Sequence, residues 1–468
     1  NWSTWTFARS SLRINSVAYS AHSLAPIIKS YDIRGLVGSE ISEDFCRDVG
    51  IAFANLVDSD EIVVGFDMRP SSKSLVAAFS EGVRATGTNV INIGLAATDQ
   101  LYFATGFLRI PGAMFTASHN PAEYHGIKLA RSEARPIGAD SGLEVIREAL
   151  ISGNLSTSSR TGSEKSMDLL QRYGEHLRSL VSCSSIRSLK IVVDAGNGMA
   201  GYTVPPVLGP LNLEIVPMYF ELDGTFPNHE ANPLDLSTLR DLQARVVVEQ
   251  ADLGLAFDGD ADRCFLIDEK GAVVDPSHLT ALIAERELQR SPGATIIYSL
   301  ISSRVVPEVI KGNGGIASRS KVGHSNIKAQ MAETGAIFGG EHSGHFYFKE
   351  FWNADSGMLA ALYAISALGN SDAGQTFSSI IDKYRKYVAS GEINSKVSDV
   401  KSTMAKVEAK FGGAGVIDRL DGITISSDSW WLNVRASNTE PLLRLNVEAE
   451  NDAIMSRIRD EALEVIRH

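Results

Sequence analysis

Strand-like apolar runs alternate with stretches of helical spacing through most of this 468-residue chain, and this alternation limits the possible folds more than any other feature. The run 61–67 is typical of a buried strand, 75–84 has the spacing of a helix, and 90–94 is typical of the next strand. The same strand pattern returns at 190–194 and in a set that begins at 294–298. Strands that alternate with helices form helix-covered sheets, so the sequence predicts three related α/β units in tandem.

The C-terminal stretch has a different pattern. Residues 421–425, 430–434 and 442–447 are typical of short antiparallel strands. A helix with Asp452 as its cap is predicted to follow. The apolar residues on one face of that helix are Ile454, Ile458, Ala462 and Ile466. This order of elements predicts a separate α+β domain.

The length of the chain requires several domains, because a domain usually holds roughly 100–200 residues. Candidate boundaries are the polar stretches at 153–163 and 390–402 and the turn at Gly271. The predicted segments are an N-terminal extension at 1–24, α/β domains at 25–163, 164–270 and 271–386, and an α+β domain at 387–468.

The N-terminal extension contains Arg9 and Arg13, many serines and no acidic residue. This composition is typical of an organellar transit peptide. The plainer interpretation, an upstream-extended start or a remnant of expression, is favoured. We assign the extension no role.

Composition and charge exclude several classes of protein. Apolar residues make up 44% of the chain and charged residues 21%, which are ordinary globular values. A net charge of −12 argues against a nucleic-acid surface. No apolar stretch approaches the roughly 20 residues of a membrane span, and three scattered cysteines favour a reducing compartment. We expect a cytoplasmic protein, monomeric or homodimeric, that binds neither nucleic acid nor membranes.

A loop at 116–121, with the sequence TASHNP, is the first candidate for chemistry and is called the serine loop below. It follows the apolar run 113–115, which is typical of a strand end. The loop places the hydroxyl of Ser118 in a turn beside the imidazole of His119. A serine held on a turn accepts and returns a group when a base, a counter-charge and a metal reach it.

Three carboxylates follow the predicted strand 253–257, spaced by a glycine and an alanine: Asp258, Asp260 and Asp262. Carboxylates on a tight loop suit a hard divalent cation, with magnesium favoured over calcium. A solvated acidic turn is one alternative. A helix–loop–helix calcium site is another, although Arg263 stands where that loop needs glycine. Together with the serine loop, this acidic loop suggests phosphoryl transfer.

Further loops carry polar groups in suggestive patterns. The run 435–441, RASNTEP, offers a guanidinium, hydroxyls and an amide to a phosphate dianion, although an ordinary hairpin is the alternative. In the run 340–345, GEHSGH, Glu341 and Ser343 project with the same sense, which suits vicinal sugar hydroxyls. A capped loop with surface histidines is the alternative there. The run 31–35, YDIRG, and His324 give weaker signals.

Taken in chain order, five runs resemble the α-D-phosphohexomutase superfamily: 31–35, 116–121, 258–263, 340–345 and 435–441. They cover the chain from about residue 25 to its C-terminus. Within the superfamily, YDIRG and GEHSGH are similar to the bacterial phosphomannomutase/phosphoglucomutase family. The resemblance implies three tandem α/β domains with mixed sheets plus a C-terminal α+β domain around a central cleft, to which each domain contributes one loop.

The resemblance also implies a reaction. The enzyme would move phosphate between the 1- and 6-positions of a hexose phosphate. It would convert mannose 6-phosphate to mannose 1-phosphate, and it would act on glucose phosphates as well. A phosphoserine at Ser118 would carry it through a 1,6-bisphosphate intermediate. The implied cofactors are Mg²⁺, bound by Ser118, Asp258, Asp260 and Asp262, and glucose 1,6-bisphosphate as activator. The alternatives are a phosphoglucosamine mutase, a metal-dependent sugar-phosphate phosphohydrolase and an inactive sugar-phosphate sensor.

The resemblance implies residue roles as well. Lys128 and Arg34 would lie near the transfer centre, with Arg263 assisting and His119 in support. The implied substrate-binding residues are Tyr31, His324, Glu341, Ser343, Arg435, Ser437, Asn438 and Thr439, the last four for a fixed phosphate. In one departure, many relatives carry a lysine near 301–304, whereas this chain has none between Lys270 and Lys311. Arg304 is the candidate substitute.

Overall fold

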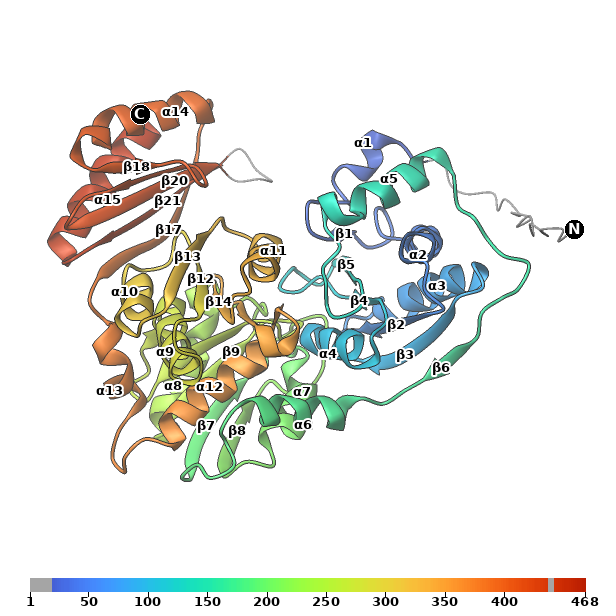
Figure 1. Ribbon diagram of the computed structural model, residues 1–468, viewed down its shortest axis with the longest axis horizontal. Coiled ribbons are helices and arrows are strands. Elements are labelled where there is room, and N and C mark those ends of the chain that lie inside the picture. The colour runs from blue at the N-terminus through green and yellow to red at the C-terminus, as the bar shows by residue number, and fades with distance from the viewer. Residues whose placement is uncertain (1–18, 437–441) are drawn as a thin grey trace, which may run out of the picture. The chain divides into compact units, whose positions relative to one another are not determined.

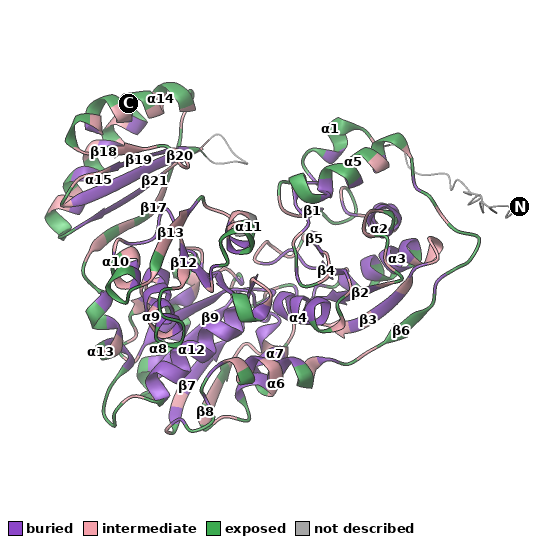
Figure 2. Ribbon diagram, in the orientation of Figure 1, coloured by how far each residue is buried: buried purple, intermediate pink, exposed green. Residues whose placement is uncertain are grey.

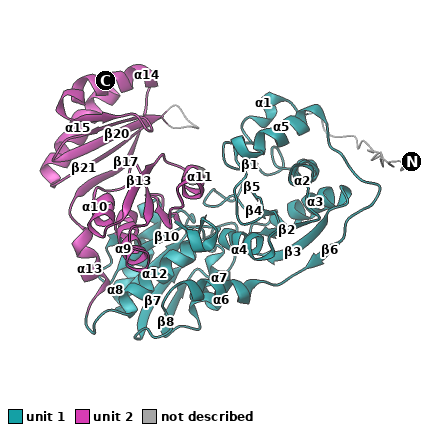
Figure 3. Ribbon diagram, viewed as in Figure 1, with its two compact units in different colours: residues 1–273, 347–374 teal, residues 274–346, 375–468 magenta. Residues whose placement is uncertain are grey.

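The computed structural model describes residues 19–436 and 442–468, apart from the side chains of residues 324 and 325. It contains two compact units (Figure 3). Unit 1 comprises Asn1–Val273 and Tyr347–Gly374, and unit 2 comprises Val274–Phe346 and Gln375–His468. No helix of the described residues is long and apolar enough to cross a membrane.

The first sheet of unit 1 has six strands in the order β1-β5-β4-β2-β3-β6 (Figure 1). Its strands are β1 (Ile33–Leu36), β2 (Glu61–Phe66), β3 (Asn89–Leu95), β4 (Gly112–Phe115), β5 (Tyr124–Ala130) and β6 (Glu164–Ser166). Strands β2, β3, β4 and β6 are parallel, whereas β5 runs antiparallel to both β4 and β1. The sheet is therefore mixed, and the strands predicted at 61–67 and 90–94 are confirmed.

Helices cover this sheet because each has an apolar face. They are α1 (Ala21–Leu24), α2 (Glu43–Val57), α3 (Ser72–Ala85), α4 (Thr98–Leu108) and α5 (Leu143–Ser152). Helix α2 begins where the Ser42 side chain accepts a hydrogen bond from the N–H of Phe45. The core between α2, α3 and the sheet contains the fully buried rings of Phe53, Phe79 and Phe115.

The second sheet of unit 1 has the order β11-β10-β9-β7-β8. Its strands are β7 (Leu189–Asp194), β8 (Leu213–Met218), β9 (Leu253–Phe257), β10 (Cys264–Asp268) and β11 (Val273–Val274). The helices beside it are α6 (Leu170–Leu180), α7 (Ala200–Leu208) and α8 (Arg240–Glu249). Strands β7, β8 and β9 are parallel, and β10 returns antiparallel to β9. The predicted strand at 253–257 is confirmed.

A long buried helix completes unit 1. Helix α12 (Gly357–Gly369) is buried at every residue (Figure 2) and contacts α6, α7 and β10. Before it lie β15 (Phe346–Phe348) and β16 (Ala354–Asp355), an antiparallel pair. An all-round apolar helix of this kind belongs in the core.

Unit 2 begins with a parallel sheet in which β12 (Thr295–Ser299) pairs with β13 (Ile316–Ser320) and with β14 (Phe338–Gly340). The helices of this part are α9 (Pro276–Arg290), α10 (Val305–Gly312), α11 (His324–Thr334) and α13 (Phe377–Ile381). Helix α9 begins at a capping Asp275, whose carboxylate accepts from the N–H of Ser277, and it has proline at its first position. The strand predicted at 294–298 is confirmed.

The C-terminal sheet of unit 2 has the order β17-β21-β20-β19-β18, and all its pairs are antiparallel. Its elements are β17 (Val388–Lys396), α14 (Val400–Phe411), β18 (Val416–Asp418), β19 (Ile423–Ser426), β20 (Trp430–Ala436), β21 (Leu442–Ala449) and α15 (Asp452–Arg467). The predicted fold class, three α/β domains and an α+β domain, is confirmed.

One local prediction for this domain is wrong. The cap of α15 is Asn451, whose side chain accepts from the N–H of Ile454, and Asp452 is the first helical residue. The predicted apolar face is confirmed: Ile458, Ala462 and Ile466 are buried, and the partly buried Ile454 packs against the same core beside Met455. An Asn-Asp pair offers two capping side chains, and the hydrogen bond selects the first.

Candidate functional site

The serine loop leaves β4 and turns sharply at Ser118, which is 2% exposed and has a φ of 51°. Its N–H donates to Oγ1 of Thr116 at 2.9 Å. Its hydroxyl donates to Oδ2 of Asp258 at 2.9 Å. A left-handed conformation is unfavourable for a residue other than glycine, so surrounding contacts must hold it.

The acidic loop joins β9 to β10, and its three carboxylates are buried with their oxygens within 4.8 Å of one another: Asp258, Asp260 and Asp262. Strands on both sides exclude the helix–loop–helix calcium site. A Cβ on Gly259 would lie 2.4 Å from the carbonyl oxygen of Ser118, so only glycine permits this approach of the two loops. The predicted convergence of the carboxylates is confirmed.

The buried charges of the acidic loop depend on Lys128. Burial raises the pKa of Asp258 well above its usual range, and the carboxylates of Asp262 and Asp260 raise it further. Nζ of Lys128 donates to Oδ2 of Asp260 at 2.7 Å and to Oδ2 of Asp262 at 2.6 Å. Burial alone would lower the pKa of Lys128, but these two carboxylates raise it well above its ordinary value. The ammonium thus offsets part of the acidic charge.

These residues fit a hard divalent cation. Oδ1 of Asp260 is buried and accepts no hydrogen bond from any residue that the structure describes. Three converging carboxylates with such an unsatisfied oxygen are a suitable ligand set for magnesium.

Thr98, at the start of α4, supports the acidic loop and was not predicted. Its hydroxyl donates to Oδ2 of Asp260 at 2.5 Å, and its N–H donates to the carbonyl oxygen of the same aspartate at 3.0 Å. The two residues are 162 positions apart, so no local pattern in the sequence points to the contact.

His119 and Arg263 complete the surroundings of Ser118. Nδ1 of His119 lies 3.2 Å from Oγ of Ser118 and 3.0 Å from Nη2 of Arg263. The guanidinium only donates, so Nδ1 is the acceptor. Neighbouring side chains of an extended segment point apart, but the left-handed φ of Ser118 breaks this alternation and lets His119 approach Oγ.

Arg34, on β1, reaches the serine loop through Asn120. Its Nη1 donates to Oδ1 of Asn120 at 2.5 Å, and its Nη2 pairs with Asp32 at 2.5 Å. Tyr31 lies just before this strand and is partly exposed. Arg34 therefore contacts the loop that carries Ser118.

Unit 2 holds the loop 340–345, which is predicted to bind sugar hydroxyls and is called the sugar loop below. Glu341 is 3% exposed, and its Oε1 accepts from the N–H of Gly323 at 2.9 Å. Oγ of Ser343 lies 3.0 Å from Nδ1 of His345. His324 begins α11, but its side chain lies outside the described residues. The carboxylate of Glu341 thus ties this loop to the turn before α11.

Arg435, at the end of β20, is 7% exposed and already paired. Its Nη2 lies 2.5 Å from Oε2 of Glu392 on β17, and Arg444 contacts the other oxygen of Glu392 at 3.2 Å. A phosphate on Arg435 would compete with this carboxylate. The other predicted phosphate ligands, Ser437, Asn438 and Thr439, lie outside the described residues.

Arg304, the candidate substitute for the missing lysine, binds a turn of the C-terminal sheet of unit 2. Its guanidinium donates to three carbonyl oxygens of the turn between β19 and β20: Ser427 at 2.5 Å, Asp428 at 2.8 Å and Trp430 at 2.9 Å. Its N–H donates to Oε1 of Glu448 at 3.0 Å. The guanidinium joins α10 to the C-terminal sheet of unit 2 and has few donors left for a substrate.

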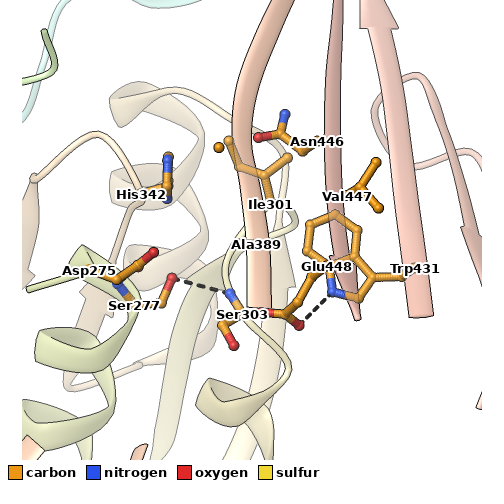
Figure 4. A pocket seen from close by; sticks show the side chains of 11 residues that line it. Asp275, Ser277, Ile301, Ser303, His342, Ala389, Trp431, Asn446, Val447 and Glu448 are labelled. Atoms are coloured by element: carbon orange, nitrogen blue, oxygen red, sulfur yellow. Dashed lines mark hydrogen bonds between the residues drawn. The ribbon is translucent and has the colours of Figure 1, made fainter. Parts of the chain in front are cut away.

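A small recess lies beside this junction (Figure 4). His342 and Ser303 border the recess. Trp431 and Glu448 border it too, and Nε1 of Trp431 donates a hydrogen bond to the carboxylate of Glu448 at 2.8 Å. Burial raises the pKa of Glu448 above its ordinary value. The recess thus connects the sugar loop with the C-terminal domain of unit 2.

Comparison with protein families assigns four consecutive stretches of the chain. Models described as phosphoglucomutase/phosphomannomutase alpha/beta/alpha domains I, II and III match residues 25–152, 171–271 and 275–387. The model described as the phosphoglucomutase/phosphomannomutase C-terminal domain matches residues 392–465.

Relatives match nearly the whole chain. A protein named phosphohexose mutases from Xanthomonas campestris pv. campestris (strain B100) is 41% identical over 442 residues, which are 94% of this chain and 98% of the relative. A phosphomannomutase of Salmonella montevideo is 38% identical over 93% of this chain and 97% of the relative. The crystal structure of a phosphoglucomutase/phosphomannomutase family protein from Burkholderia thailandensis has a TM-score of 0.86 and 32% identity, and it covers 94% of this chain and 98% of its own.

The chain therefore belongs to the phosphoglucomutase/phosphomannomutase family, and the predicted superfamily is confirmed. It is an enzyme of the isomerase class, an intramolecular phosphotransferase.

Proposed function

We propose that this enzyme moves phosphate between the 1- and 6-positions of hexose phosphates through a phosphoserine at Ser118. Its relatives are named phosphohexose mutases and phosphomannomutases, and hexose phosphates are its substrates. Mannose 6-phosphate to mannose 1-phosphate is the favoured reaction, with glucose phosphates also accepted. The observation that carries the proposal is the 2.9 Å hydrogen bond from Ser118 to Asp258, at the edge of three converging carboxylates.

Each half-reaction exchanges one phosphorus–oxygen bond. The bond between the phosphate and Oγ of Ser118 breaks while the free sugar hydroxyl forms a bond to phosphorus and gives up its proton. The sugar, now a 1,6-bisphosphate, turns over in the site. Its other phosphate then returns to Ser118, and the oxygen that it leaves takes up a proton. Glucose 1,6-bisphosphate would recharge an enzyme that has lost its phosphate.

The residues around Ser118 supply charge and hydrogen bonds for this transfer. Mg²⁺ held by Asp258, Asp260, Asp262 and an oxygen on Ser118 would stabilise the negative charge of the transferring group. Lys128 is our main candidate for the positive charge beside the transfer centre, because its ammonium lies against two of these carboxylates, which keep it protonated. Arg263 and Arg34 assist, and His119 is in support, with its Nδ1 3.2 Å from Oγ of Ser118.

Unit 2 would supply substrate recognition. Glu341 and Ser343 bind the 3- and 4-hydroxyls, and Arg435 binds the fixed phosphate with the three residues that follow Ala436. His324 of unit 2, and Tyr31 of unit 1, would add further substrate contacts. Glucose and mannose share both hydroxyls and differ at position 2, so the enzyme accepts both sugars. A phosphoglucosamine mutase, the second candidate, would need a residue that recognises position 2.

The experiment supplies mannose 1-phosphate with catalytic glucose 1,6-bisphosphate and magnesium, then measures hexose 6-phosphate and free phosphate. We expect hexose 6-phosphate without phosphate release, and no product with Ser118→Ala. Ser80→Ala is the matched control, because Ser80 is equally buried and its hydroxyl has no hydrogen-bond partner among the described residues. Stoichiometric phosphate release would instead indicate a phosphohydrolase.

A further inference from the structure

Arg69 binds the backbone of the serine loop through several hydrogen bonds. It lies between β2 and α3 and is 2% exposed. Its Nη1 and Nη2 donate to four carbonyl oxygens of one loop segment: Ser118 at 3.0 Å, Asn120 at 2.6 Å, Pro121 at 2.8 Å and Tyr124 at 3.0 Å. A guanidinium has five N–H groups, so four of them are directed to this segment.

Asp67 fixes the guanidinium from the other side. Its Oδ2 lies 3.2 Å from Nε of Arg69, and its Oδ1 accepts from the N–H of Arg69 at 3.0 Å and from the hydroxyl of Ser72 at 2.7 Å. The side chains of Asp67 and Arg69 are both fully buried. Burying an ion pair costs free energy unless further hydrogen bonds offset that cost, and here the loop carbonyls accept hydrogen bonds from both Nη groups of Arg69.

The carbonyl of Ser118 is held between two neighbours. Nη2 of Arg69 donates to it, and Gly259 of the acidic loop approaches it so closely that a Cβ would lie 2.4 Å away. The ring of Phe226, 5.2 Å from the guanidinium carbon, packs against Arg69 as well. The serine with the left-handed backbone is therefore pressed against the loop that carries the carboxylates.

We propose that Arg69 is a positioning residue for the phosphoryl transfer: it clamps the serine loop so that Oγ of Ser118 stays beside Asp258. This inference rests on the proposed role of Ser118 as the phosphate carrier. Lysine keeps the charge of Arg69, but it has three donors on one nitrogen and cannot span four carbonyls. A displaced nucleophile transfers phosphate slowly even when the substrate binds normally.

The test compares Arg69→Lys with Arg178→Lys. Arg178 is the matched control, because its Nη1 also donates to backbone carbonyls in unit 1, those of Pro206 and Val207 at 2.5 and 3.1 Å. For each variant the measurements are kcat and KM for mannose 1-phosphate, the rate at which glucose 1,6-bisphosphate phosphorylates the dephosphorylated enzyme, and hydrogen exchange of the peptide 113–127.

For Arg69→Lys we expect kcat and the phosphorylation rate to fall about 10- to 100-fold, with KM changed by less than about threefold. Amide exchange should accelerate in 113–127 and stay unchanged elsewhere. Arg178→Lys should lower Tm but leave kcat and the exchange of 113–127 unchanged. A purely structural role for Arg69 would lower Tm without this pattern, and a folded Arg69→Lys enzyme with a normal phosphorylation rate would overturn the proposal.

A second variant covers the case in which Arg69→Lys does not fold. Asp67→Asn keeps the shape of the side chain but removes the charge that faces the guanidinium, and we expect a smaller fall in kcat of about 3- to 10-fold with KM unchanged. An unchanged kcat in this variant would also contradict the clamp. Ser118→Ala separates the two proposals: mutase activity in that variant would refute the phosphoserine itself, whereas an inactive Ser118→Ala enzyme beside a normal Arg69→Lys enzyme would refute only the clamp.

Discussion

The hydroxyl of Ser118 donates a 2.9 Å hydrogen bond to the carboxylate of Asp258, although the two residues are 140 positions apart in the chain. The contact joins a loop of the first sheet of unit 1 to a loop of its second sheet. It forms because Gly259 lets the acidic loop touch the backbone of Ser118. The proposed nucleophile and the candidate metal site thus share one hydrogen bond.

Removing one carboxylate should abolish metal-dependent activity. In Asp260→Asn, a buried oxygen that accepts no hydrogen bond from the described residues is replaced by an amide, which is a weaker ligand for magnesium. We expect kcat to fall by at least about 100-fold, and we expect the magnesium concentration that gives half-maximal activity to rise. Magnesium titrations of activity test this, with the exposed Asp372→Asn as the charge-matched control. An unaltered magnesium requirement would remove Asp260 from the metal site.

Lys128→Met should separate catalysis from metal binding. The substitution removes the ammonium that pairs with Asp260 and Asp262 but keeps the length of the side chain. We expect kcat to fall about 100-fold or more, because the positive charge beside the transfer centre is lost. Magnesium affinity, measured by calorimetry, should persist or increase, since a competing cation is gone. Near-normal turnover would exclude Lys128 from the mechanism.

Arg435→Ala should weaken the binding of every hexose phosphate alike. A charge-assisted phosphate contact is worth about 1.5–3 kcal/mol, so KM should rise about 10- to 100-fold. The factor should be similar for mannose phosphates and glucose phosphates. Arg444→Ala is the control, because Arg444 binds the same Glu392 but lies outside the predicted phosphate loop. Steady-state kinetics with both sugars measure the effect. A change confined to one sugar would show that Arg435 recognises sugar identity.

Asp99 should make the stability of the metal-free protein depend on pH. It is fully buried, and burial raises its pKa to about 7, although the hydroxyls of Ser356 and Tyr173 donate to it at 2.6 and 2.8 Å. The pKa of Asp99 is higher in the folded protein than in the unfolded chain. The contribution of protonated Asp99 to the free energy of unfolding is therefore complete below a pH of about 4, and it is lost as the pH rises through 7.

Relative to the wild type, Asp99→Asn should therefore gain free energy of unfolding between pH 4 and 7, by up to about 4 kcal/mol. The asparagine oxygen still accepts from both hydroxyls, so the variant should fold. Urea titrations of both proteins in EDTA across this pH range provide the measurement. A difference that is independent of pH would show that Asp99 is ionised throughout.

The side chains of Ser118 and of the three aspartates could be predicted from the sequence, because each group lies within one short run of consecutive residues, 116–121 or 258–263. Arg69 and Thr98 were missed for a physical reason: they act on backbone carbonyls and on a distant carboxylate, which leave no pattern in their own surroundings. The approach of His119 to Oγ of Ser118 depends on the left-handed φ of Ser118, which the sequence does not show. The contacts of Arg304 were not predicted because its partners are the carbonyls of a turn more than 120 positions away.

The most direct test is the mass spectrum of peptides from enzyme purified without phosphatase, before and after incubation with glucose 1,6-bisphosphate. A phosphate on Ser118 that accumulates with the bisphosphate and disappears on addition of hexose monophosphate is the predicted result. Phosphate on another residue, or active enzyme whose Ser118 never carries phosphate, would contradict the proposed reaction.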